Sequence, residues 1–231
     1  MTGLEAIQAR HSVRKYIDKP IEAEKAKAIQ ECIDECNRAG GLHLQLITDE
    51  PVAFGNGIDL PKYGKFEGVG NYIALVAPKG SEGDELTGWY GEKVVLLAQT
   101  LGLNSCWVGL TFKKVRTAYS VSQGEELKGV IALGYGATQG VQHPQKKTID
   151  DVAVNKSGKP YPEWFVRGIE AALLAPTAVN QQKFEFMLHP DSRVEAKTKF
   201  SFIGYTRIDL GIAKYHFELA AGKENFNWKS I

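Results

Sequence analysis

Three short segments of the chain hold residues whose types and spacing could do chemistry. The first is Arg10-His11-Ser12-Val13-Arg14, which places two guanidinium groups, an imidazole and a hydroxyl within five residues. Planar guanidinium forks suit phosphate oxygens, and a hydroxyl adds a neutral donor. Because a solvated basic turn has the same composition, the spacing leaves phosphate binding and a plain surface turn equally open.

The second segment is Ala175-Pro176-Thr177-Ala178-Val179-Asn180-Gln181-Gln182, which follows an apolar helical pattern. Its proline ends the helix, and a hydroxyl and three carboxamides follow in a turn. Carboxamides both donate and accept hydrogen bonds, which suits the edge of a heterocycle that carries imide N–H and C=O groups. A polar turn with an asparagine cap is the alternative interpretation.

The third segment is Gly102-Leu103-Asn104-Ser105-Cys106-Trp107-Val108-Gly109. Two glycines bracket an extended stretch with an aromatic residue, so its backbone N–H groups could approach a flat ligand closely. A buried edge strand explains the pattern nearly as well. Cys106 has no activating neighbour, and we interpret it as a packing residue.

Composition excludes several classes of function. Among the 231 residues, Lys and Arg number 28 against 27 Asp and Glu, so no broad basic field predicts nucleic-acid binding. No apolar run of about 18 residues predicts a membrane span, and no leader pattern is seen. Three cysteines fit a reducing compartment, and the five histidines lack zinc-site spacing. We therefore expect a soluble, cytoplasmic protein without a metal, and we expect His216 to be half-exposed on a helix.

Periodicity predicts the elements that position these segments. Helices are expected over residues 4–9, 22–38, 89–101, about 165–173 and 210–220, and strands over 42–48, 72–77, 104–110, 130–133 and 184–188. Residues 51–70 are predicted to form a long loop. The charged and glycine-containing stretch 146–162 is the best domain boundary, and helices that do not alternate strictly with strands indicate an α+β fold.

Taken together, these motifs resemble the FMN-dependent nitroreductase family, and the chain resembles its putative TM nitroreductase branch. Arg10 to Arg14 resembles the family's clamp on the flavin phosphate and ribityl chain, and residues 102–109 resemble the segment that faces flavin N5. Residues 127–135 resemble the family's penultimate strand and glycine turn. Lys146 and Lys147 resemble a basic pair that closes over the phosphate.

One departure from the family pattern predicts the domain organisation. The family's Pro-Ser/Thr-x-x-Asn-x-Gln motif is absent after the first long helix, at residues 36–43, and Pro176-Thr177-Ala178-Val179-Asn180-Gln181 appears later instead. Family members resemble one another in being homodimers in which this motif reaches over from the other subunit. We therefore expect a fused pseudo-dimer with helices around a mostly antiparallel sheet. Residues 1–154 carry the clamp, residues 160–231 donate the motif, and one FMN binds per chain.

The resemblance implies an oxidoreductase that passes hydride from NAD(P)H through flavin N5 to nitroaromatic or quinone-type acceptors in ping-pong order. It needs no catalytic side chain, and Arg14 serves as a cation that tunes the flavin. The expected cofactor-binding residues are Arg10, His11, Ser12, Arg14, Tyr63, Trp107, Val108, Gly109, Lys146, Lys147, Pro176, Thr177, Ala178, Asn180 and Gln181.

Other functions remain open at this point. Dehalogenation, dehydrogenation or flavin fragmentation would need a substrate lid, for which the loop at 51–70 with Lys62, Tyr63 and Lys65 is the candidate. A flavin carrier that never turns over, or a chain that has lost the cofactor, are further alternatives. The sequence leaves open whether the fused chain is a monomer or dimerises again.

Overall fold

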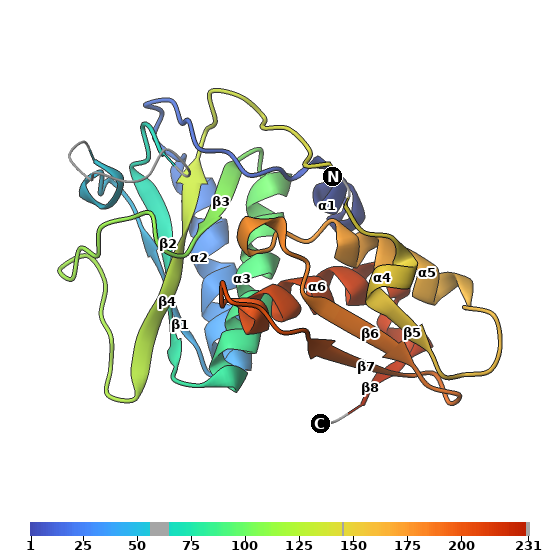
Figure 1. The fold of residues 1–231 in the computed structure, drawn as a ribbon. Coiled ribbons are helices and arrows are strands. Elements are labelled where there is room, and N and C mark those ends of the chain that lie inside the picture. The colour runs from blue at the N-terminus through green and yellow to red at the C-terminus, as the bar shows by residue number, and fades with distance from the viewer. Residues whose placement is uncertain (56–64, 145, 230–231) are drawn as a thin grey trace.

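The first sheet of the chain is antiparallel throughout. We describe residues 1–55, 65–144 and 146–229 in a computed structural model (Figure 1). The sheet contains β1 (His43–Ile47), β2 (Asn71–Pro78), β3 (Asn104–Val108) and β4 (Glu125–Gly134) in the order β1-β2-β4-β3. Its strand pairs β1–β2, β2–β4 and β3–β4 are all antiparallel.

Helices α2 (Ala23–Gly40) and α3 (Ser81–Thr100) cover one face of this sheet, and the short α1 (Gly3–Ala9) precedes them. The predicted apolar stripe of α2 is buried, as Ile29, Cys32, Ile33 and Cys36, and the helix ends at Gly41 in a left-handed conformation. Helix α3 begins well before the predicted residue 89. Three glycines among its first eleven residues hide the helical pattern, because glycine is a poor helix former.

A second, mixed sheet follows. It contains β5 (Ala153–Asn155), β6 (Phe184–Leu188), β7 (Arg193–Thr198) and β8 (Asn227–Trp228), in that order. The remaining helices are α4 (Ile149–Val152), α5 (Glu163–Leu173) and α6 (Thr206–Ala221), with short 3-10 turns at Val52–Phe54, Ala178–Asn180 and Lys223–Asn225. The predicted α+β fold with a mostly antiparallel sheet is confirmed. The second sheet already begins at Ala153, which pairs with Phe186 just before the proposed boundary at residue 154.

Helices α3 and α6 cross where the two sheets meet, in the middle of the molecule (Figure 1). Glycines make this approach possible on both sides. A Cβ atom on Gly88 would lie 2.0 Å from the Ile208 carbonyl oxygen, and one on Gly211 would lie 2.0 Å from the Glu85 carbonyl oxygen. The backbones are therefore in direct contact at the crossing, which joins α3, packed on the first sheet, to α6, packed on the second.

No helix among residues 1–55, 65–144 and 146–229 is both long and apolar enough to cross a membrane.

Candidate functional site

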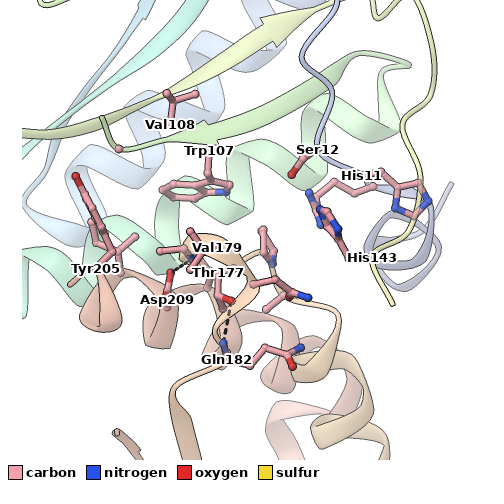
Figure 2. Close-up of a pocket in the computed structure, with 18 of the residues that line it drawn as sticks. His11, Ser12, Trp107, Val108, His143, Thr177, Val179, Gln182, Tyr205 and Asp209 are labelled. Atoms are coloured by element: carbon pink, nitrogen blue, oxygen red, sulfur yellow. Dashed lines mark hydrogen bonds between the residues drawn. The ribbon is translucent and has the colours of Figure 1, made fainter. Parts of the chain in front are cut away.

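A cavity of about 640 Å³ is lined by residues of the first sheet and by residues at the ends of α5 and α6 (Figure 2). A volume of this size is typical of sites for small molecules and cofactors. Residues of all three sequence segments line it together: Arg10, His11, Ser12, Arg14, Trp107, Val108, Gly109, Pro176, Thr177, Ala178, Val179, Asn180 and Gln182. The fold therefore brings the N-terminal arginines and the late amide segment to one hollow.

The N-terminal segment reaches the cavity along the edge of the first sheet. Ser12 forms a parallel bridge with Ser105 of β3, and the Val13 N–H donates to the Ser105 carbonyl at 3.1 Å. Val13 is buried between its neighbours, whereas Ser12 and Arg14 remain partly exposed on the cavity side. Alternation along an extended backbone thus presents the polar residues of this run to the cavity.

One end of the cavity is cationic; we define this cationic end as Arg10, His11, Ser12, His143 and Lys146. His11, His143 and Ser12 lie near one another there (Figure 2). Arg10 is only 7% exposed, and its buried Nε atom has no hydrogen-bond partner among the described residues. Burial, and then the neighbouring Arg10 charge, lower the pKa of His11. This end can therefore receive an anion and satisfy a buried donor.

The β3 wall of the cavity is flat and aromatic. The Trp107 ring lies against Gly91 of α3, where a Cβ atom would come within 2.5 Å of the indole. Its Nε1–H donates to the Glu92 carboxylate at 2.8 Å, which fixes the ring orientation. Gly109 makes room in the same way for the ring of Tyr205, which also lines the cavity. Glycines thus allow two aromatic rings to line one narrow space.

Opposite this wall lies a turn formed by residues 176–182, which we call the amide turn (Figure 2). Val179, Asn180 and Gln182 have φ angles of +46°, +54° and +45°. The left-handed region is costly for a β-branched residue such as valine, and such strain persists only where surrounding bonds enforce it. Two of these bonds are drawn in Figure 2: the Gln182 N–H donates to Thr177 Oγ1 at 3.0 Å, and the Ala178 N–H donates to Asp209 at 2.9 Å.

Asp209 of α6 supports the amide turn from behind. It is 3% exposed, and its two oxygens accept from the Ala178 N–H and from Gln181 Nε2, the latter at 2.8 Å. Burial raises the pKa of Asp209 to about 7, even though both hydrogen bonds act to lower it. Asp209 also lines the cavity. Neither Asp209 nor its connection to the turn was predicted, because a lone aspartate in a helical pattern gives no signal.

The two glutamines of the turn have different roles from those expected. Gln181 does not line the cavity; its amide donates to Asp209 and to the Gly204 carbonyl at 3.1 Å. Gln182 does line it, and the buried Oε1 atom of Gln182 has no partner among the described residues. Of the two, Gln182 rather than the expected Gln181 therefore lines the cavity. The spacing Pro-Thr-x-x-Asn-x-Gln, counted from Pro176, ends on Gln182 and could have identified it.

Lys146 and Lys147 have different surroundings. Lys146 lines the cavity, whereas the Lys147 ammonium donates to the backbone carbonyl of Gln182. Burial lowers the pKa of Lys147. Of the expected pair, only Lys146 is thus positioned to reach an anion, and Lys147 contacts the amide turn instead. Tyr63, also expected at the site, lies outside the described residues.

A buried cluster around Glu92 connects α3 to α6 and to Arg10. Glu92 of α3 and His216 of α6 are both fully buried, with His216 Nε2 3.0 Å from Glu92 Oε1. His216 Nδ1 lies 3.0 Å from the Ala171 carbonyl oxygen, and Arg10 Nε lies 3.7 Å from Glu92. The expectation of a half-exposed His216 is wrong, because the crossing of α3 and α6 covers that helix face.

The arrangement can bind a flat molecule with an anionic tail. The cationic end offers donors for the tail, Trp107 and Val108 offer an apolar wall, and the amide turn offers donors and acceptors for a ring edge. No three His, Cys, Asp or Glu side chains gather as metal ligands within the described part of the chain.

The chain is similar to proteins of one family. The sequence model described as "Putative TM nitroreductase" matches residues 3–221. The solved structure of a putative nitroreductase from Thermotoga maritima MSB8 is 20% identical, has a TM-score of 0.67, and is matched over 97% of this chain and 85% of its own. No curated protein matches the chain significantly.

Two shorter structures share the fold. A putative nitroreductase in complex with FMN from Desulfovibrio desulfuricans is 18% identical with a TM-score of 0.51, matched over 70% of this chain and 99% of its own. A putative NADH oxidase from Clostridium acetobutylicum is 20% identical with a TM-score of 0.50, matched over 64% of this chain and 96% of its own. Each is therefore matched almost completely by about two thirds of this chain.

Proposed function

The chain belongs to the putative TM nitroreductase family, and from this premise we propose that it is an FMN-dependent oxidoreductase that transfers hydride from NAD(P)H to nitroaromatic or quinone-type acceptors. The observation that carries the proposal is the cavity of about 640 Å³, in which the N-terminal arginines and the amide turn face one another. These segments lie more than 160 residues apart in the sequence, so their meeting is a property of the fold.

The residues present fit FMN in three respects. The buried Nε of Arg10 lies 3.7 Å from Glu92 but has no hydrogen-bond partner within the described chain, so it can donate to a phosphate oxygen. The buried Oε1 of Gln182 likewise lacks a partner and can accept from a ring N–H. The wall between them is apolar and aromatic, as a planar ring requires.

Arg10, Ser12 and Lys146 would hold the phosphate, with His11 and His143 alongside it at the cationic end. Charge-assisted hydrogen bonds from guanidinium groups are the strongest available for this purpose. Arg14 also lines the cavity, and it would place a positive charge near the ring edge where negative charge collects on reduction. Thr177, Asn180 and Gln182 would contact that edge or the ribityl chain.

When bound, FMN supplies the hydride chemistry, and the protein supplies binding, orientation and electrostatics. The backbone N–H of Val108 or Gly109 would donate to flavin N5 and orient the reacting atom. Gly109 lines the cavity and is exposed to solvent, so NAD(P)H and the acceptor could reach the same face of the flavin in turn. Because the two substrates would occupy this face one after the other, we expect ping-pong kinetics.

We further propose that the chain is a fused pseudo-dimer, with residues 1–154 and 160–231 as its two parts. The contacts at the helix crossing support this. Gly88 meets Ile208, three residues before Gly211, and Gly211 meets Glu85, three residues before Gly88. Reciprocal contacts of this kind are typical of an interface with two-fold symmetry. The shorter nitroreductase-fold structures, matched by about two thirds of this chain, are consistent with one complete unit plus an addition.

The visible absorption spectrum of the purified protein tests the proposal. We expect flavin absorption that bleaches anaerobically when NADPH or NADH is added and returns when a quinone is added. Steady NAD(P)H oxidation with the quinone separates an enzyme from a flavin carrier. A colourless protein that FMN does not reconstitute would contradict the proposal.

A further inference from the structure

Asp209 is the only buried carboxylate that lines the cavity among the described residues. Its oxygens accept hydrogen bonds from the Ala178 N–H at 2.9 Å and from Gln181 Nε2 at 2.8 Å, so one side chain binds both the backbone and a side chain of the amide turn. We propose that Asp209 is a positioning residue whose carboxylate holds the amide turn in its binding conformation, so that protonation of this side chain loosens the turn and weakens flavin binding. The flavin part of this inference rests on the proposed function.

The amide turn has a strained backbone conformation that Asp209 stabilises. Val179 and Asn180 lie in the left-handed region directly after Ala178, the residue whose N–H is bound. Valine rarely adopts this conformation unless surrounding contacts impose it. If the bond to Ala178 weakens, the backbone at Val179 can relax, and Asn180 would leave its place on the cavity wall.

Protonation removes part of this support for a simple reason. A carboxylate can accept both bonds with full strength, and bonds to a charged acceptor are the stronger kind. A carboxylic acid has one good acceptor oxygen, and its O–H is a donor that here faces two other donors. One of the two bonds must therefore weaken. Because burial raises the pKa of Asp209 to about 7, this change falls near neutral pH.

The charged groups around Asp209 interact with one another rather than with it. On α6, Arg207 and Lys214 pair with Glu85 of α3, at 3.5 Å and 2.6 Å. Lys128 of β4 pairs with Asp84 of α3. Tyr205, at the start of α6, is the titratable group that shares this part of the wall, and burial raises its pKa above the usual value. Tyr205 therefore stays neutral across the range in which Asp209 titrates.

The experiment compares the wild type with Asp209→Asn at several pH values. The variant keeps the shape of the side chain but replaces one accepting oxygen with an NH₂ donor. The matched control is Asp34→Asn on α2, whose exposed carboxylate also accepts from a glutamine, Gln30, at 2.8 Å. FMN affinity is measured by quenching of flavin fluorescence. The protection of the Ala178 amide is measured by NMR hydrogen exchange in the flavin-free protein, corrected for the intrinsic rate.

We expect the wild type and Asp34→Asn to bind FMN about tenfold more tightly at pH 8.5 than Asp209→Asn does, the size of one lost charge-assisted bond. This difference should shrink at pH 5.5. Titration of His11 and of the FMN phosphate affects all three proteins equally, so it cancels in the comparison. Ala178 protection should rise with pH in the wild type and stay low in Asp209→Asn.

Equal pH profiles for the wild type and Asp209→Asn would overturn the inference. A failure of the proposed function looks different, because then no protein binds FMN, while Ala178 protection still reports on Asp209. If Asp209→Asn does not fold, Gln181→Ala replaces it, since this variant removes one donor and leaves the buried carboxyl in place. Unchanged Ala178 protection and FMN affinity in Gln181→Ala would also count against the inference.

Discussion

Arg14 lies on the cavity wall, and its position suits a cation that stabilises reduced flavin. We expect Arg14→Ala to lower the two-electron reduction potential by about 30 mV, which corresponds to about 1.4 kcal/mol of lost stabilisation. We also expect FMN to dissociate more readily. Redox titration of the loaded protein measures the potential. Lys15→Ala is the control, because Lys15 is exposed and pairs with Glu67 at 2.9 Å. An unchanged potential in Arg14→Ala would remove Arg14 from this role.

Asp209 also makes global stability depend on pH. Its pKa is raised from 3.8 to about 7 in the folded protein, so the fold binds this proton more tightly than the unfolded chain does. The resulting stability is fully present below pH 4 and is lost as the pH rises through 7. Between pH 5 and pH 8.5 the wild type should therefore lose about 3 kcal/mol more than Asp209→Asn.

Urea unfolding at several pH values measures this difference, with Asp34→Asn as the exposed control. Parallel stability profiles for the wild type and Asp209→Asn would show that the buried carboxyl does not titrate in this range. The expected trend is opposite in sign to the trend in Ala178 protection. The global fold and the local turn can therefore be separated in one set of samples.

At the scale of single residues, the sequence was sufficient to predict those whose side-chain type itself suggests a binding role. Arg10, Ser12, Trp107 and Asn180 could be named because guanidinium, hydroxyl, indole and amide groups occur in short runs, and all four line the cavity. Asp209 and Glu92 could not be named. Neither is the only carboxylate in its helix, and the importance of each comes from partners far away in the chain.

The crossing of α3 and α6 depends on two glycines. We expect Gly88→Ala to cost about 3 kcal/mol of stability, because the new methyl group would lie 2.0 Å from a backbone oxygen that cannot turn away. The helix propensity of alanine returns only about 1 kcal/mol of this. Gly70→Ala is the control, since a Cβ atom there meets nothing within 4 Å. Thermal unfolding measures both, and equal melting temperatures would contradict the close approach.

Glu92 joins the same two helices through buried contacts. Its carboxylate lies 3.0 Å from His216 Nε2 and 3.7 Å from Arg10 Nε. We expect Glu92→Gln to destabilise the protein by about 3 kcal/mol, because it leaves the buried Arg10 guanidinium without its counter-charge. Glu35→Gln, at an exposed pair with Lys93, should cost less than about 1 kcal/mol. Similar losses in both variants would argue against a buried ion pair.

At the scale of elements, apolar periodicity was sufficient for α2, β2 and β6. The start of α3 was missed because its glycines serve the contact with α6 rather than helix propensity. Strand β7 was missed although Val194 and Ala196 alternate with polar residues, because charged residues between them hide the pattern. β5 has only three residues, and its pairing with β6 determines it.

The whole molecule should bind one FMN. The run Arg10 to Arg14 has no counterpart after residue 160, so the sequence contains one such phosphate-binding candidate. We expect a flavin-to-chain ratio near one from the absorbance of the denatured, released cofactor. A ratio near two would contradict the fused arrangement with a single retained site.

Both walls of the cavity belong to one polypeptide. A pocket built between two separate subunits disappears on dilution below their dissociation constant, whereas a covalent connection keeps the walls at a high effective concentration at any dilution. The covalent connection also means that the two walls need not have the same amino-acid sequence. In a homodimer every substitution occurs twice, while here the wall that carries Arg10 and the wall that carries Asn180 can each change alone, one toward the tail of the ligand and the other toward its ring.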